Sequence, residues 1–170
     1  MGIPTYLQMD NTLATQGSHR HPRSFGLVIR LCLLLGIQPI FIPIREPWRN
    51  GIIERFNQDF DKLFLRTQFF KNFAYLCAQA VNFEVYRESN HRYSTLHGHT
   101  PAQHATDNLK LLSKNFEIPQ KLDIKPGFIH LIRFIRSNRV LDIFGENFLM
   151  PLSVVYEYVW ATIDTEQQKL

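Results

Sequence analysis

Residues 25–44 read FGLVIRLCLLLGIQPIFIPI, and this stretch decides the fold class. Its first half places leucines at helical spacing before Gly36, a typical helix end, so we expect a buried helix over Phe25–Leu35. Its second half, Ile37–Ile44, is rich in β-branched residues and bounded by Gly36 and Pro43, which indicates a buried strand. A helix followed at once by a buried strand favours an α/β fold.

Upstream of this stretch we expect a strand that ends at Asp10 and a loop over Thr12–Ser24, which is rich in polar residues, Gly and Pro. Downstream, Arg45–Asn50 reads as a polar loop, and a long helix begins at Gly51. A second helix is expected over Asn72–Val85, and a third begins at Thr100-Pro101. Helical spacing favours core positions over a base-stacking surface for Phe56, Phe60, Phe64, Phe69, Phe70 and Phe73.

The sequence changes character after Lys114, where prolines give way to short apolar runs separated by tight turns. These runs predict a small β-barrel over residues 126–170, joined by a linker over 115–125 to a first domain over 1–114. Val154–Ile163 reads as a strand, and residues 168–170 read as the start of another strand that is not completed. We therefore expect a truncated barrel with an open edge.

Composition indicates a globular protein, because 45% of the 170 residues are hydrophobic and only 20% are charged. No apolar run approaches the roughly 20 residues of a spanning helix, so we expect no membrane partner. Nothing at the N-terminus resembles a signal peptide, and two cysteines imply no disulfide framework. The net charge of +4, biased toward residues 1–67, is compatible with a polyanionic partner but does not require one.

Two carboxylates stand out by position, Asp10 at the end of a strand and Glu54 in the first turn of a helix. Such a pair can converge on Mg²⁺, which takes one or two carboxylates together with substrate phosphate oxygens. The structural alternative stays open for each, because Asp before Asn is common in turns and Glu near a helix N-terminus stabilises the macrodipole. Zinc is disfavoured at His19/His21 and His97/His99, because no Cys-x-x-Cys pair accompanies them.

Several blocks of the chain resemble the integrase catalytic core of insertion-sequence transposases and retroviral integrases. They are LQMDN at 7–11, Gly36-Ile37 with Pro39, PWRNGIIERFN at 47–57, NHRYSTL at 90–96 and TPA at 100–102. The resemblance implies a partial RNase H-like fold followed by the small barrel. It also implies DNA strand cleavage and joining, the chemistry of DNA integration and recombination, with Mg²⁺ or Mn²⁺ held by carboxylates in the order Asp, Asp, Glu. Asp10 matches the second Asp and Glu54 matches the Glu.

The same resemblance implies DNA as a partner, and a homo-oligomer or an upstream transposase half as a protein partner. It implies a DNA-associated protein in the cytoplasm of a bacterium or archaeon. Phosphate contacts are expected from the barrel arginines, although these side chains are equally expected simply to face water. The residues expected to bind DNA are Asn11, Arg49, Asn50, Arg55, Asn57, Arg133 and Arg136.

Three departures from the family pattern bear on activity. Residues 1–9 contain no Asp or Glu that matches the first catalytic Asp, Glu54 follows Asp10 by 44 positions, and Thr12 stands where the family has Gly. We therefore expect a truncated copy that does not cut or join DNA alone, although Asp10 and Glu54 should lie close together. The alternative function is a non-catalytic DNA-binding or subunit-assembly remnant.

Overall fold

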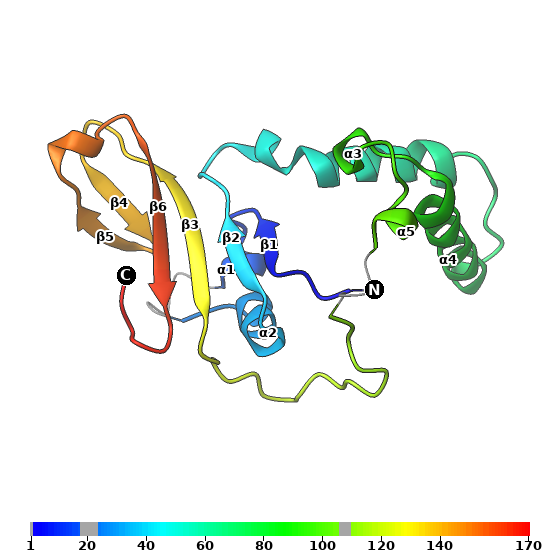
Figure 1. Cartoon of the computed structure of the whole chain (residues 1–170), viewed down its shortest axis with the longest axis horizontal. Coiled ribbons are helices and arrows are strands. Elements are labelled where there is room, and N and C mark those ends of the chain that lie inside the picture. The colour runs from blue at the N-terminus through cyan, green and yellow to red at the C-terminus, as the bar shows by residue number, and fades with distance from the viewer. Residues whose placement is uncertain (1, 18–23, 106–109) are drawn as a thin grey trace. The chain divides into compact units, whose positions relative to one another are not determined.

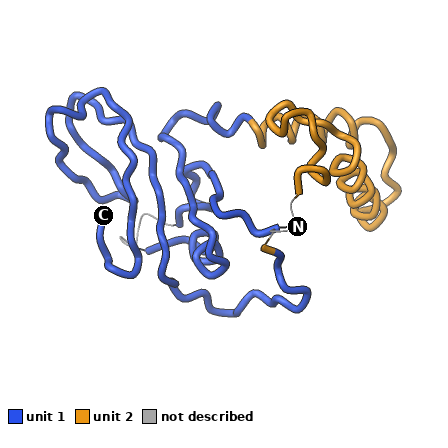
Figure 2. Tube along the Cα trace, in the orientation of Figure 1, with its two compact units in different colours: residues 1–51, 111–170 blue, residues 52–110 orange. Residues whose placement is uncertain are grey.

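The computed structural model describes residues 2–17, 24–105 and 110–170. The chain divides into two compact units, which Figure 2 shows in different colours. Unit 1 combines residues 1–51 with residues 111–170, and unit 2 comprises residues 52–110. The expected linker and C-terminal segment thus belong to the same unit as the first two strands.

Unit 1 is built on a four-stranded mixed sheet (Figure 1). Its strands are β1 (Tyr6–Met9), β2 (Gln38–Phe41), β3 (Phe128–Phe134) and β6 (Tyr158–Asp164), in the order β1-β2-β3-β6. The first three run parallel, and β6 is antiparallel to β3. The expected mixture of helices and strands is therefore confirmed as an α/β fold.

Helix α2 (Leu27–Leu35) connects β1 to β2 and covers one face of the sheet. It ends at Gly36, whose φ of 73° is the left-handed conformation that glycine adopts at little cost. Side chains from α2 and the strands form the core: Met9, Ile29, Cys32, Leu33, Phe41, Ile129, Leu131 and Ala161. The expected helix and strand of residues 25–44 are confirmed, although the helix is two residues shorter than predicted and the strand is half as long.

The loop expected over Thr12–Ser24 contains a short helix, α1 (Leu13–Gln16). The backbone at Gly26 passes close to the end of α1, where the N–H of Gly26 donates a hydrogen bond to the carbonyl of Gln16 at 2.8 Å. An added Cβ on Gly17 would lie 2.7 Å from the Gly26 nitrogen, so this close approach requires glycine. His19 and His21 lie outside the described residues.

The described residues between 126 and 170 form no closed barrel. Strand β3 instead pairs with β2, while β4 (Val140–Ile143) and β5 (Glu146–Leu149) form a separate hairpin. Short strands with tight turns look the same in a barrel and in a sheet extension, so the sequence pattern did not distinguish the two. The last residues turn back as expected, with a bridge between Asp164 and Lys169.

Unit 2 is helical. It contains most of α3 (Gly51–Phe60), a π-helical turn over Asp61–Leu65, α4 (Phe73–Asn90) and α5 (Pro101–His104). The rings of Phe60, Phe64 and Phe83 pack with centroids 4.9–5.6 Å apart, as expected of core positions. Phe56, Phe69 and Phe73 are 43%, 86% and 80% exposed, so the core prediction was wrong for these three. No helix within the described ranges is long and apolar enough to cross a bilayer.

Candidate functional site

Asp10 lies directly after β1, at the carboxyl end of the parallel strands. Its Oδ1 accepts hydrogen bonds from the hydroxyls of Thr12 at 3.1 Å and Thr15 at 3.4 Å. The Thr15 hydroxyl is also 2.8 Å from the carbonyl oxygen of Asp10. The threonines of the α1 turn therefore orient this half-buried carboxylate at the sheet end where open α/β folds bind ligands.

Glu54 lies in the first turn of α3 and is exposed. It belongs to unit 2 and Asp10 to unit 1, so each carboxylate is described by itself and their expected proximity stays a prediction. Across the described ranges, no three His, Cys, Asp or Glu side chains gather as a metal site. A Glu in this position also stabilises the helix N-terminus, so its structural reading stays open.

The turn that precedes Glu54 is held against β1. The amide nitrogen of Gln8, two residues before Asp10, donates to the carbonyl of Arg49 at 2.7 Å and approaches Oδ1 of Asn50 at 3.4 Å. The turn itself is a 3₁₀ helix over Pro47–Asn50. The sequence block that carries the resemblance is thus in contact, within unit 1, with the strand that carries Asp10.

Arg49 is held in place by two partners. Its Nε lies 2.5 Å from Oε2 of Glu46, and its guanidinium stacks 4.9 Å from the ring centroid of Tyr158. The Tyr158 hydroxyl donates to the other oxygen of Glu46 at 2.7 Å. The hydrogen bond from Arg49 is the main reason that the pKa of Glu46 is lowered. Arg49 remains 40% exposed and is therefore accessible to an anion.

Arg133 does not fit its expected role as a DNA contact, because it is only 4% exposed. Its guanidinium donates to the carbonyls of Ile42, Ile132 and Asp142 and to the Asn11 side chain, at 2.9–3.2 Å. Burial lowers the pKa of Arg133 to about 10. Arg133 therefore has a structural role, since it links β3 to the residues that follow β1 and β2. The sequence, in which Arg133 is close to other arginines, did not reveal this role.

Asn11 belongs to the same buried network and is likewise engaged. Its Oδ1 accepts from Arg133 at 2.9 Å and from Gln16 at 2.7 Å, and its Nδ2 donates to the carbonyl of Ile42 at 2.6 Å. An amide with these three bonds has little capacity left for DNA. Its position beside Asp10 instead fixes the end of β1.

The other expected DNA contacts are accessible. Arg55 is exposed and forms an ion pair of 3.3 Å with Asp59, one helical turn away. Asn57 and Arg136 are exposed. An exposed ion pair contributes little stability, so Arg55 can change partners at low cost.

His130 is a residue that the sequence analysis missed. Trp160 donates its indole N–H to Nδ1 of His130 at 3.1 Å, and Nε2 lies 2.8 Å from Oε1 of Gln38. Because indole only donates, Nδ1 must accept, and the ring is neutral with its proton on Nε2. Burial lowers the pKa of His130, consistent with this neutral form. Only its position in the alternating pattern of β3 could have suggested an interior role.

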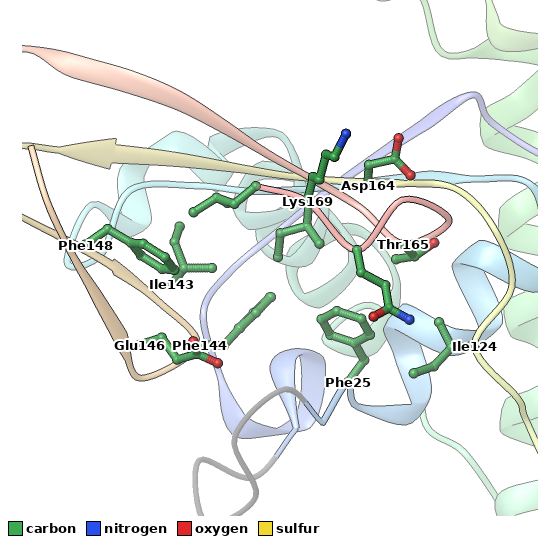
Figure 3. Close-up of a pocket in the computed structure, with 12 residues that line it drawn as sticks. Phe25, Ile124, Ile143, Phe144, Glu146, Phe148, Asp164, Thr165 and Lys169 are labelled. Atoms are coloured by element: carbon green, nitrogen blue, oxygen red, sulfur yellow. The ribbon is translucent and has the colours of Figure 1, made fainter.

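Two cavities open on unit 1. The larger, of about 650 Å³, is mostly apolar and is shown in Figure 3. The rings of Phe25 and Phe144 meet edge-on in its wall at 5.8 Å, and Lys169 stands at its rim. The smaller, of about 370 Å³, lies at the carboxyl ends of β2 and β3. Its charged lining residues are Arg45, Glu46, Arg133, Arg136 and Asp142.

Comparison with known proteins adds no relative. A scan against models of protein families finds no match, and neither does a search of curated proteins.

Proposed function

We propose that this chain is a DNA-binding protein of the integrase type, related in chemistry to DNA strand transfer, in which Asp10 and Glu54 are metal ligands. The observation that carries the proposal is the contact of Gln8 with the turn over Pro47–Asn50. It joins the block that precedes Glu54 to the strand that ends at Asp10. The same two blocks carry the sequence resemblance to an RNase H-like integrase core.

The carboxylates fit a hard divalent cation. One oxygen of Asp10 is occupied by threonine hydroxyls, which leaves lone pairs on the other oxygen, and Glu54 faces solvent. Mg²⁺ or Mn²⁺ takes such oxygen ligands, and when bound it neutralises phosphate charge and activates an attacking oxygen. We propose that the phosphate and sugar groups of DNA are bound by Arg49, Asn50 and Arg136 in unit 1 and by Arg55 and Asn57 in unit 2.

A second candidate is a non-catalytic DNA-binding or assembly protein. It is favoured because residues 1–9 contain no carboxylate and because the described residues form no cluster of three ligands. Two metal ions roughly 3.5–4 Å apart need more ligands than one Asp and one Glu provide. We therefore expect the chain alone to bind DNA without cutting it.

The test combines DNA binding, metal binding and strand cleavage on the full chain. DNA affinity is measured by fluorescence anisotropy, Mn²⁺ affinity by electron paramagnetic resonance, and cleavage on a supercoiled plasmid. We expect Asp10→Asn and Glu54→Gln each to weaken Mn²⁺ binding at least about tenfold, since a hard cation loses one of two charged ligands.

Glu88→Gln is the matched control, since Glu88 is an exposed helix residue in unit 2 outside the motif. Plasmid nicking that is lost in Glu54→Gln but kept in the control would establish catalysis and reject the second candidate. Equal Mn²⁺ binding by the wild type and both variants would refute the metal assignment. The absence of any DNA binding would refute both candidates.

A further inference from the structure

The sheet face opposite α2 carries exposed aromatic rings. Alternation along β3 and β6 places Phe128, Phe134, Tyr158 and Trp160 on this face, and the pairing sets Phe134 opposite Tyr158. Their ring centroids are 5.0 Å apart. Tyr158 is 48% and Trp160 55% exposed. We refer to these four residues as the aromatic face.

Hydrogen bonds at their polar atoms hold the rings of Trp160 and Tyr158 in place. Trp160 is fixed through its indole N–H on His130, and His130 is fixed in turn by Gln38 and Thr162. Tyr158 is fixed through its hydroxyl on Glu46. Flat surfaces held in place in this way can stack on a ligand with little loss of side-chain freedom.

Arginines surround the carboxyl end of this face. Arg49 lies over the Tyr158 ring, and Arg45 and Arg136 line the 370 Å³ cavity beside Phe134. Two carboxylates also line the cavity, but that of Glu46 is already bound by Arg49 and Tyr158. The cavity and its border therefore have an excess of positive charge.

We propose that the aromatic face binds single-stranded nucleic acid. Bases stack on Phe134, Tyr158 and Trp160, and the phosphates that join them meet Arg45 and Arg136. Alternating flat and anionic groups are the chemistry of a nucleic-acid strand, and aromatic rings beside cations are the groups that bind it. A protein partner fits less well, because a polar centre of Gln38, His130 and Thr162 separates Phe128 from the Phe134–Tyr158 pair. This inference rests on the DNA binding proposed above, with which it shares Arg136, but it uses neither Asp10 nor Glu54.

The test uses the fluorescence of Trp160 in the full chain. Trp48→Phe leaves Trp160 as the only tryptophan. The probe is oligothymidylate of about 12 nucleotides, a length typical of the roughly 4–16 nucleotides bound by such surfaces. We expect the oligonucleotide to quench Trp160 and to bind more tightly than a duplex of the same length. Tyr158→Leu should weaken binding about 5- to 150-fold, the range expected for loss of one stacked base.

Tyr86→Leu is the matched control, because Tyr86 is 63% exposed on α4 in unit 2. Binding weakens as the salt concentration rises, and the slope of log affinity against log salt concentration measures the number of phosphate contacts. Arg136→Gln should make this slope about 0.7 less steep, the value for one phosphate of a single strand. Arg66→Gln, a change of an exposed arginine in unit 2, should leave it unchanged. Circular dichroism establishes that each variant is folded.

Three results would overturn the proposal: no quenching of Trp160 by the oligonucleotide, equal losses for Tyr158→Leu and Tyr86→Leu, or a dimer in light scattering whose Trp160 the oligonucleotide cannot reach. The last result would assign the face to a second copy of the chain. Because these variants leave both carboxylates intact, failure here is distinguishable from failure of the metal assignment.

Discussion

Replacing Arg133 by methionine tests the buried network that joins the ends of the first three strands. Methionine keeps most of the side-chain volume but removes every donor. Two of the four acceptors keep another partner: the carbonyl of Ile42 still accepts from Asn11, and Asn11 still accepts from Gln16. The carbonyls of Ile132 and Asp142 lose the donor supplied by Arg133.

The magnitude follows from these two carbonyls. A buried acceptor that loses its donor costs about 1–3 kcal/mol, which gives about 2–6 kcal/mol for the pair. Relief of guanidinium burial offsets part of this cost, because burial lowers the pKa of Arg133 to about 10. We therefore expect Arg133→Met to lower the free energy of unfolding by about 2–3 kcal/mol, or the melting temperature by roughly 4–12 °C.

The assay is urea unfolding followed by tryptophan fluorescence, which reports on unit 1 because both Trp48 and Trp160 lie there. Arg136→Met is the control, since Arg136 is exposed and should change stability by less than about 0.5 kcal/mol. Equal effects of the two substitutions would show that the Arg133 network contributes no stability and would refute the reasoning.

Two further predictions concern pH and helix capping. Burial lowers the pKa of His130, so the unfolded chain binds the proton more readily, and stability should be full above pH 6.5 and fall as the pH drops below it. His130→Gln should reduce this fall, measured as the urea midpoint between about pH 8 and about pH 5. Thr100 and Gln103 form a reciprocal capping box at the start of α5. Thr100→Ala should cost unit 2 about 1 kcal/mol in thermal melts followed by circular dichroism, whereas exposed Thr95→Ala should cost almost nothing.

Local patterns predicted local structure well. The leucine spacing and Gly36 predicted α2, the β-branched run predicted β2, and Thr100-Pro101 predicted the start of α5. The partner of β3 could not be predicted, because pairing of Phe41 with Leu131 joins segments separated by the whole of unit 2. Nothing in the local composition of residues 128–134 distinguishes a barrel strand from a sheet strand.

The candidate site shows the same limit. Asp10 was predicted at the end of a strand and directly follows β1, and Glu54 was predicted in the first turn of a helix and lies in the first turn of α3. Asn11 and Arg133 were predicted to bind DNA from the sequence resemblance, but each donates to the carbonyl of Ile42, the residue that follows β2. Whether a polar side chain faces solvent depends on long-range pairing, which a single sequence does not display.

The insertion of unit 2 between β2 and β3 has a consequence for how the protein folds. During synthesis, β1, α2 and β2 leave the ribosome before their central partner strand β3 exists, so β2 has an unpaired edge. The helices of unit 2 make mostly local contacts and can form before β3 is synthesised. Once unit 2 has folded, the chain between β2 and β3 behaves as a shorter loop, so bringing β3 to β2 costs less entropy. The step that completes the central sheet is therefore late, and a ribosome-stalled chain that ends before residue 128 should be prone to aggregation.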